Sequence, residues 1–318
     1  MHPLMLKPAV KDYLWGGTRL KSEFFLESQT QIAAEGWMLS CHKDGPSVVE
    51  NGELKGKTLP EVLEIWGEKA VGKKGAAFKD FPILIKLIDA KQKLSVQVHP
   101  DDSYALKNEG EFGKTEMWYV VDCEEGAKLI YGFTENISTE EFIRRIEENT
   151  LTDVCNFVPV NKGDVFFIPA GTLHAIGDGI LIAEVQQNSN STYRVSDYGR
   201  LGADGKPREL HVQKAIDVTR CEIPTVPYGQ VGEIKADENK TTRLLAQCDL
   251  FTAKFLKLKG KTEILNEESF VCLLCLEGES ELSFGNEKIK ITKGKTVFIP
   301  AGVGCFLEGN GELLYVNM

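Results

Sequence analysis

The chain has 318 residues, of which 42% are hydrophobic and 26% charged, so it is expected to fold rather than to stay disordered. Its 37 Lys and Arg residues are outnumbered by 47 Asp and Glu residues, and the net charge of −10 argues against sequence-independent nucleic-acid binding. No apolar stretch approaches the roughly 20 residues that span a bilayer, and the N-terminus lacks the pattern of a secretory signal, so we expect a cytoplasmic protein with no membrane partner. A small anionic ligand remains compatible with this charge, because a few Arg and Lys residues can hold one phosphate.

The cysteine spacing predicts reduced thiols rather than a disulfide framework. Eight cysteines are scattered along the chain, at a low density for a disulfide-stabilised domain. Cys272 and Cys275 form a C-x-x-C pair, but they lie in the apolar run SFVCLLCLEG, which predicts a strand. Residues i and i+3 of a strand face opposite sides, so this pair is a poor metal or redox candidate.

Apolar runs bounded by turn residues predict strands in the first half of the chain. Two such runs are FPILIKLIDA, at residues 81–90, and KLSVQVHP, at residues 93–100. Asp101 and Asp102 follow directly and look like a paired-carboxylate site. Capping of a helix that begins there explains them more simply.

Amphipathic spacing predicts helices between the strands. Ser138 is followed three residues later by Glu141, which is the sequence pattern of a capping box at a helix N-terminus. The polar segment at 224–240 carries Pro and Gly residues and predicts a domain boundary. The expected helices lie at residues 58–71, 138–149 and 209–219.

A self-similar block is the most informative feature of the sequence. Residues 163–176 read GDVFFIPAGTLHAI, and residues 294–307 read GKTVFIPAGVGCFL. Both fit G-x5-P-x-G-x2, followed by His174 in the first block and by Cys305 in the second. Each block also follows an apolar strand and a Gly turn, so two copies of a β-rich unit predict two small barrels in tandem.

The fold expected from these patterns is mostly β, with two related barrels and a small helical insertion. The first barrel, with its helical segments, is placed at residues 1–225. The second, degenerate barrel is placed at residues 226–318 and is expected to hold no metal.

A group of ligand-type residues points to a metal site in the first barrel. Gln97 and His99 are two apart on a predicted strand and therefore share a face, Glu116 opens the next strand, and His174 follows the Pro-x-Gly corner. Three conventional ligands and one amide oxygen suit a divalent ion with an open position, and zinc accepts such nitrogen and oxygen atoms at about 2.0–2.2 Å. A lone His on a strand is more often a core residue, so the prediction depends on the combination. Cys305 in place of His174 predicts no ion in the second barrel.

Several motifs make the chain resemble a known family. The block at 163–174 looks like the second motif of the cupins. Together with further segments, it is similar to type I mannose-6-phosphate isomerases in their short bacterial form. The motifs that carry this resemblance are YLWGGTRL (13–20), EGWMLS (35–40), LSVQVHPDD (94–102), GKTEMW (113–118) and AGTLHAIGDGILIAEVQQNSNSTYR (170–194).

The resemblance implies tandem cupin (jelly-roll) barrels and one Zn²⁺ per chain. It implies a catalytic role for Arg194, which lies ten residues after Glu184 without a gap, as in the family. It also implies that the basic residue six further on, Arg200, binds the substrate phosphate. The implied zinc ligands are Gln97, His99, Glu116 and His174.

Two further residues are candidates for the chemistry. Lys114 lies two residues before Glu116 and corresponds to the family's K-x-E motif, so it is a second catalytic candidate. The hydroxyl of Ser95 is a second candidate for binding phosphate. Many relatives have Asp-Asn ahead of the Arg, whereas Asn190 stands here, which leaves Lys114, a metal-bound water or another carboxylate as the acid–base group.

The expected reaction is the interconversion of mannose 6-phosphate and fructose 6-phosphate through an enediol. It needs proton transfer, positive charge near the enolate oxygens and a grip on the phosphate. Two alternatives stay open: a sugar-phosphate sensor that has lost the chemistry, and another cupin metalloenzyme such as an iron dioxygenase. Gln97 in the position of a first His argues against a redox metal. A small sugar phosphate is the expected partner, and a monomer or small homo-oligomer the expected assembly.

Overall fold

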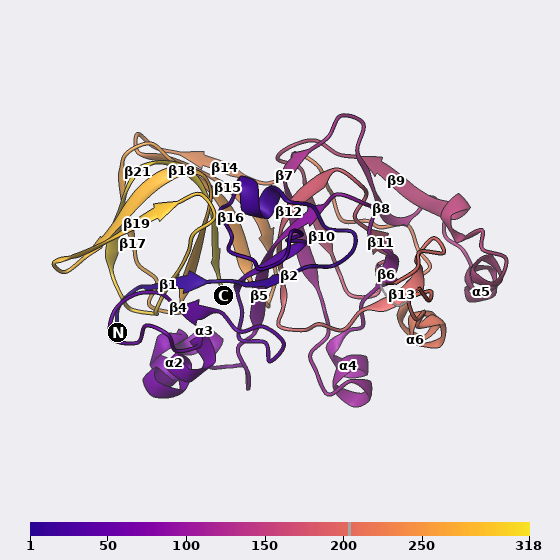
Figure 1. The fold of residues 1–318 in the computed structure, drawn as a ribbon, viewed down its shortest axis with the longest axis horizontal. Coiled ribbons are helices and arrows are strands. Elements are labelled where there is room, and N and C mark those ends of the chain that lie inside the picture. The colour runs from indigo at the N-terminus through magenta and orange to yellow at the C-terminus, as the bar shows by residue number, and fades with distance from the viewer. Residues whose placement is uncertain (203–204) are drawn as a thin grey trace. The chain divides into compact units, whose positions relative to one another are not determined.

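The structure, a computed structural model, describes residues 1–202 and 205–318. These residues form two compact units (Figure 1). Unit 1 contains residues 1–11, 18–87 and 231–318, and unit 2 contains residues 12–17 and 88–230. Each unit is discontinuous in the chain, and the boundary between them nearest the C-terminus lies between Gln230 and Val231. The boundary between the two barrels at 225/226 stays a prediction.

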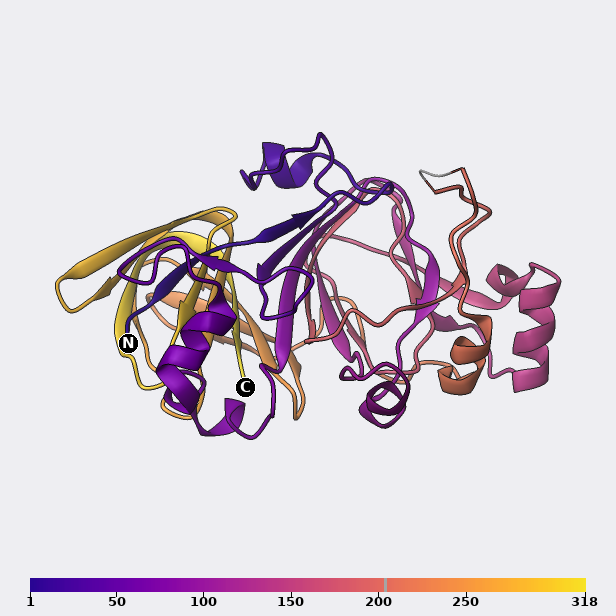
Figure 2. The same cartoon turned by 60° about the horizontal axis from the view of Figure 1, so that its bottom comes forward.

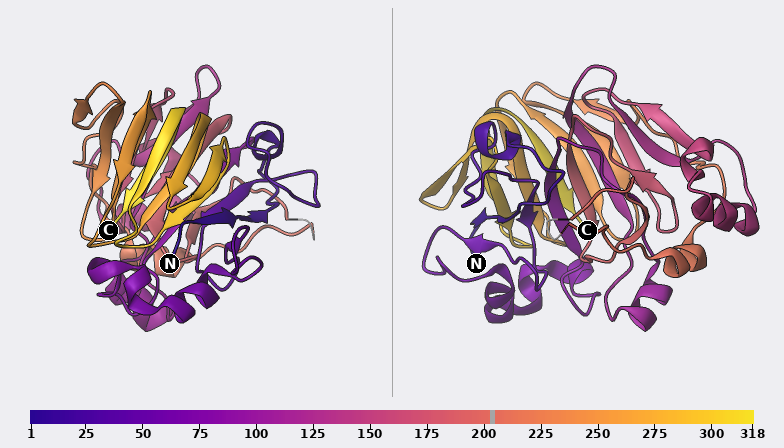
Figure 3. Two further views of the ribbon diagram at one scale, coloured as in Figure 1. Left: turned by 90° about the vertical axis from the view of Figure 1, so that its left-hand side faces the viewer. Right: turned by 45° about the vertical axis from the view of Figure 1, so that its right-hand side comes forward.

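Unit 1 is built on an antiparallel sheet in which both ends of the chain take part (Figure 3, left). The strand order is β14-β15-β16-β21-β18-β20-β1-β4, with β17 paired to β21 and β19 to β18. Its C-terminal strands are β14 (Ile234–Ala236), β15 (Lys240–Gln247), β16 (Thr252–Leu258), β17 (Lys261–Ile264), β18 (Val271–Phe284), β19 (Glu287–Thr292), β20 (Thr296–Ile299) and β21 (Cys305–Asn317). Its N-terminal strands are β1 (Leu4–Lys7) and β4 (Val48–Val49). The same part of the chain also contains β2 (Ala9–Lys11) and β3 (Glu35–Leu39), which pair with each other.

The interior of the unit 1 sheet is apolar. Met5 of β1 packs in it together with the inward residues of the C-terminal strands. Cys275 belongs to this core cluster, whereas Cys272, three residues away, is buried outside the cluster. Cys305, the counterpart of His174, is buried in the same cluster.

The helices of unit 1 include the one predicted at 58–71, which the structure divides. Thr58 caps it with a full capping box, in which the Thr58 N–H donates to Glu61 Oε2 at 2.7 Å. The α-helix ends at Gly67 because that residue has a φ of +66°, which a helix interior does not allow. The elements are α1 (Arg19–Ser22), α2 (Leu59–Trp66), the 3₁₀-helix η1 (Gly67–Ala70) and α3 (Gly72–Gly75).

Unit 2 carries two groups of paired strands. One has the order β13-β6-β11-β8-β9, and in the other β7 lies between β10 and β12. The strands are β6 (Val96–Val98), β7 (Glu116–Cys123), β8 (Lys128–Phe133), β9 (Cys155–Pro159), β10 (Val165–Ile168), β11 (His174–Ala175), β12 (Ile180–Gln187) and β13 (Tyr193–Ser196). The division between the units falls within β5 (Ile83–Ala90).

Two helices of unit 2 begin at polar caps, as the sequence predicts. Asp101 Oδ1 accepts from the Tyr104 N–H at 2.9 Å, so this carboxylate is a helix cap. Ser138 Oγ accepts from the Glu141 N–H at 3.1 Å. The third helix starts at Val212 rather than at 209, because residues 209–211 bind β13 instead. The elements are α4 (Asp102–Asn108), α5 (Thr139–Glu147), η2 (Leu151–Val154) and α6 (Val212–Val218), and α5 and α6 lie side by side (Figure 2).

The repeated block has the same backbone conformation in both copies. The first glycine is left-handed in each, with φ of +91° at Gly163 and +82° at Gly294. The glycine of the Pro-x-Gly corner is also left-handed, with φ of +88° at Gly171 and +73° at Gly302. The repeat and the mostly β fold are therefore confirmed. No helix in the described ranges is long and apolar enough to cross a membrane.

Two glycines of the second block separate backbone strain from steric clash. A Cβ at Gly294 would lie 2.0 Å from Phe24 O, whereas a Cβ at Gly302 would have nothing within 4 Å. Gly302→Ala should cost about 1–2 kcal/mol, the penalty for a left-handed L-residue. Gly294→Ala should cost clearly more, because the Phe24 backbone must also move. Urea unfolding of both variants tests this, and equal losses of unfolding free energy would contradict it.

Candidate metal centre

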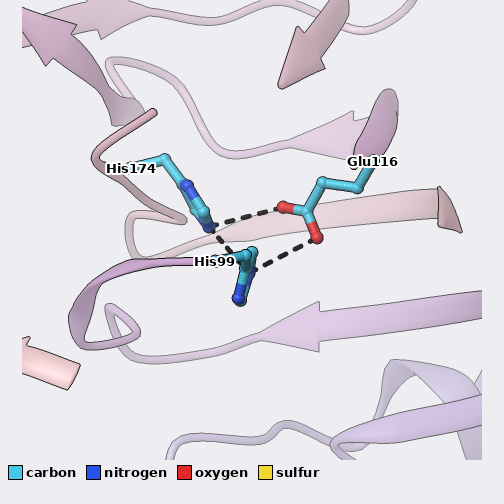
Figure 4. A group of neighbouring side chains, drawn as sticks. All are labelled: His99, Glu116 and His174. Atoms are coloured by element: carbon cyan, nitrogen blue, oxygen red, sulfur yellow. Dashed lines mark hydrogen bonds and ion pairs between the residues drawn. The ribbon is translucent and has the colours of Figure 1, made fainter. Parts of the chain in front are cut away.

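Three buried side chains from three elements of unit 2 converge on one point (Figure 4). His99 follows β6, Glu116 opens β7 and His174 opens β11. The two Nε2 atoms of His99 and His174 are 3.1 Å apart. Glu116 places Oε1 3.4 Å from His174 Nε2 and Oε2 3.6 Å from His99 Nε2. No other such group of three His, Cys, Asp or Glu side chains occurs within residues 1–202 and 205–318.

Backbone carbonyls fix the orientation of both imidazole rings. His99 Nδ1 is 2.9 Å from Ser191 O, and His174 Nδ1 is 2.8 Å from Thr172 O. A carbonyl accepts only, so each Nδ1 is assigned the proton, and each Nε2 presents its lone pair to the centre. This arrangement of a carbonyl behind each ring is typical of histidines that bind metal.

His174 is held neutral by its surroundings. Complete burial lowers its pKa to about 4, against the smaller opposing effect of the Thr172 carbonyl. Its ring meets the edge of Trp118 with centroids 5.3 Å apart. The Trp118 indole N–H in turn donates to Glu184 Oε2 at 2.8 Å. A neutral, packed imidazole is the form that ligates a metal ion.

The donor separations fit a zinc-sized ion. Bonds of about 2.0–2.2 Å place neighbouring donors of a tetrahedral ion about 3.3–3.6 Å apart. The separations between the donors of His99, Glu116 and His174 are 3.1, 3.4 and 3.6 Å. The residues present therefore fit a divalent cation with two imidazole ligands and one carboxylate.

Gln97 and Ser95 lie at the edge of this group. Gln97 Nε2 is 3.5 Å from His174 Nε2, and Gln97 Oε1 accepts from Ser95 Oγ at 3.3 Å. Gln97 is thus adjacent to the centre, but its amide nitrogen faces His174. Rotation of the amide would present the oxygen, which is the ligating atom.

Lys114 reaches the centre although no strand carries it there. The strand begins at Glu116, so Lys114 precedes it and lies in the loop before β7. The Lys114 N–H instead donates to Pro100 O at 2.9 Å. From this loop position the ammonium lies 3.0 Å from Glu116 Oε2 and 3.1 Å from His99 Nε2.

Arg194 shares a sheet face with the centre. Across β11, β6 and β13, His174 is opposite Gln97, and Gln97 is opposite Arg194. Residues directly opposite in antiparallel strands project to the same side, with Cβ atoms about 4.5–5.5 Å apart. The Arg194 Nη1–H donates to Glu209 O at 2.7 Å, and the buried Nε has no hydrogen-bond partner. Burial lowers the pKa of this guanidinium.

Arg200 lies on a tight turn that follows β13. The Arg200 N–H donates to Asp197 O at 3.0 Å, and Tyr198 and Gly199 between them have φ of +56° and +71°. Both central residues are left-handed, as in a type I′ turn. The Arg200 side chain donates through Nη2 to Lys93 O, and its buried Nη1 has no hydrogen-bond partner.

A third arginine, Arg208, was not predicted from the sequence. Arg208 binds the buried Asp197 carboxylate through two N–H groups, at 2.7 and 2.6 Å. Arg200 Nη2 is 3.9 Å from the same carboxylate. The positive charges of Arg208 and Arg200 both act on Arg194 and lower its pKa. Arg208 and Arg200 therefore lie at one buried carboxylate, whose charge also acts on Arg194. Arg208 carries no spacing signal that could have identified it, whereas Trp118 and Glu184 lie in the motifs of the resemblance without a predicted role at the site.

Comparisons with known proteins agree with this geometry. A model of the family Phosphomannose isomerase type I, catalytic domain, matches residues 4–127, and one of Mannose-6-phosphate isomerase, cupin domain, matches residues 240–318. The chain is 40% identical over 323 residues to mannose-6-phosphate isomerase ManA of Bacillus subtilis, covering 99% of both. It is 37% identical to mannose-6-phosphate isomerase of Streptococcus mutans, covering 98% of this chain and 97% of that relative.

The fold gives the same result. The crystal structure of the mannose 6-phosphate isomerase from Bacillus subtilis matches with a TM-score of 0.90 at 35% identity, covering 100% of both chains. A putative mannosephosphate isomerase from Archaeoglobus fulgidus shares the fold, with a TM-score of 0.78 at 23% identity. The sequence and fold likenesses extend over the whole chain, and the chain belongs to the type I mannose-6-phosphate isomerases, in the short bacterial form that carries a cupin domain.

Proposed function

We propose that this chain interconverts mannose 6-phosphate and fructose 6-phosphate. The observation that carries the proposal is the buried His99, Glu116 and His174 group, with Lys114 beside it and Arg194 on the same sheet face. The family supplies the substrate class. The reaction balances within the opened sugar: one proton moves from C2 to C1 through an enediol, and a hydroxyl proton moves from the C2 oxygen to the C1 oxygen.

The metal proposed for the centre is one Zn²⁺ per chain. His99, Glu116 and His174 would hold it, with Gln97 as a fourth ligand through its amide oxygen. Imidazole and carboxylate donors suit zinc, and a bound zinc ion supplies positive charge that polarises sugar oxygens. We propose no ion for the C-terminal barrel, because Cys305 lies there in an apolar core where His174 stands in unit 2.

Arg194 and Lys114 are the proposed catalytic residues. Arg194 keeps its charge at every physiological pH, so it can stabilise negative charge on the enediolate oxygens. Its Nε–H, buried and without a partner, is available to a substrate oxygen. Lys114 Nζ lies within hydrogen-bond distance of both His99 and Glu116. It can therefore donate to a sugar oxygen bound at the centre and exchange a proton with it.

Arg200 and Ser95 are the proposed phosphate-binding residues. The local charge supports this, since the guanidiniums of Arg194, Arg200 and Arg208 outnumber the carboxylates of Asp197 and Glu209. A phosphate monoester carries about −1.5 to −2 charges at pH 7 and is attracted to this positive excess. The partnerless Nη1 of Arg200 offers a donor for one phosphate oxygen.

The cellular setting is also a proposal. All eight cysteines are free, which supports a reducing, cytoplasmic compartment. The assembly is proposed to be a monomer or a small homo-oligomer.

The first prediction concerns turnover. A coupled assay should show conversion of mannose 6-phosphate to fructose 6-phosphate, loss of that activity on chelation and its return with zinc. Arg194→Ala should lower kcat by about 10²- to 10³-fold, the usual effect of removing one donor to a developing oxyanion. Zinc-loaded protein without turnover would overturn the isomerase proposal and favour a sugar-phosphate sensor.

The second prediction concerns metal content. His174→Asn should abolish stoichiometric zinc retention after dialysis, because it removes one of the two imidazole donors. Cys305→Ala, the matched change in the second block, should retain one zinc per chain. Elemental analysis of both variants measures the zinc content. Loss of zinc in Cys305→Ala alone would place the ion in the C-terminal barrel and contradict the proposed site.

The third prediction concerns phosphate. Arg200→Ala should raise KM for mannose 6-phosphate and weaken competitive inhibition by inorganic phosphate by about tenfold or more, equivalent to about 1.4 kcal/mol. Arg144→Ala, an exposed arginine on α5, is the control and should change neither constant. Unchanged phosphate inhibition in Arg200→Ala would remove Arg200 from the phosphate site.

A further inference from the structure

The strand that carries Arg194 lies at the edge of its sheet. In the order β13-β6-β11-β8-β9, β13 pairs with β6 on one side and with no strand on the other in the described part of the chain. An edge residue whose main chain points outward needs another partner. For Arg194 that partner is His211.

His211 binds both main-chain groups of Arg194. The Arg194 N–H donates to His211 Nδ1 at 3.3 Å, and the His211 N–H donates to Arg194 O at 2.8 Å. These two bonds replace, at a single residue, the ladder bonds that a neighbouring strand would form. The side chain is held as well, because Arg194 Nη1 donates to the backbone of Glu209 in the same segment.

The pairing of β13 with β6 is not enough by itself to fix the direction of the Arg194 side chain. The register shifts between Arg194 and Ser196, which marks a bulge directly after Arg194. Bulges re-aim the side chains next to them and interrupt the regular pairing. The direction of the Arg194 side chain therefore depends on the bonds to residues 209–211 as well as on β6.

We propose that His211 is a positioning residue that aims the Arg194 guanidinium at the metal centre, and that it does so only as a neutral imidazole. The inference rests on the role of Arg194 in the proposed function. His211 bonds to the main chain of Arg194 and packs beside Tyr193, so it acts on the reaction through Arg194. A neutral Nδ1 accepts the Arg194 N–H, whereas a protonated ring has no acceptor and adds a second positive charge beside the guanidinium.

The groups around His211 favour the neutral ring. Burial is the largest influence and lowers the pKa, followed by Arg194 on β13. Lys214 on α6 acts in the same direction, and Glu209 and Glu109 oppose it. The ring of Tyr193 lies with its centroid 6.3 Å away. Because the pKa is lowered, the ring stays neutral at pH 7 and activity is expected to fall only as the pH drops below the ordinary His range.

Two substitutions separate positioning from a purely structural role. His211→Ala removes the acceptor and should lower kcat by about 10- to 100-fold, the effect of small misplacements of a catalytic group, with KM changed less. His211→Asn retains an acceptor near Nδ1 and should keep most of kcat while losing the His-dependent acid limb. Gln213→Ala, on the same helix, should match the wild type. Zinc content and the unfolding midpoint should be alike in all four proteins.

The backbone amide of Arg194 gives a readout that does not need turnover. In ¹⁵N–¹H spectra, its resonance should titrate with His211 in the wild type, shift in His211→Ala and stay near the wild-type position in His211→Asn. If the wild type shows no turnover, the proposed function fails, while this resonance still reports whether the contact exists. Wild-type kcat in His211→Ala, or equal losses in Ala and Asn variants that are folded and loaded with zinc, would overturn the inference.

Discussion

Two imidazole nitrogens that face each other at 3.1 Å, each with its lone pair directed inward, set the constraint on which the site depends. Such a pair is repulsive unless a positive group lies between or beside the nitrogens. Here the Lys114 ammonium lies beside them, and the Glu116 carboxylate completes a buried charge cluster. The Ser191 and Thr172 carbonyls prevent either ring from turning away. The centre is thus pre-organised for a cation.

Local periodicity made the centre predictable, and long-range pairing did not. Alternation along a strand predicts that Gln97 and His99 share a face, and the repeated block marks where His174 lies. Lys114 reaches the centre from a loop, so its contact follows from the tertiary fold rather than from strand alternation. Arg208 and His211 join the site through a chain reversal, and one sequence carries no periodic signal for such a return. The pairing of β1 with β20, almost the full chain apart, is invisible for the same reason.

The two copies of the repeated block show how the surroundings differ between a buried residue of the proposed metal site and an apolar residue at the same position. In unit 2, the buried His174 needs a carbonyl, which Thr172 supplies, together with an aromatic neighbour and a charged partner, which Trp118 and Glu116 of β7 supply. In unit 1, the equivalent Cys305 needs only an acceptor for its weak thiol donor, which Ile264 O provides at 3.6 Å. The neighbours of Cys305 are apolar. Burial of these side chains stabilises the fold, and no charged group has to be desolvated.

The discontinuity of unit 1 has a consequence for synthesis on the ribosome. Residues 88–230 of unit 2 emerge in one uninterrupted length and have most of their partners before the last strands exist. Strand β1 appears first and must wait for β20. Until translation is nearly complete, the apolar side chains of Leu4 and Leu6 lack the sheet that buries them. The sheet of unit 1 therefore closes around β1 only after β20 has been made.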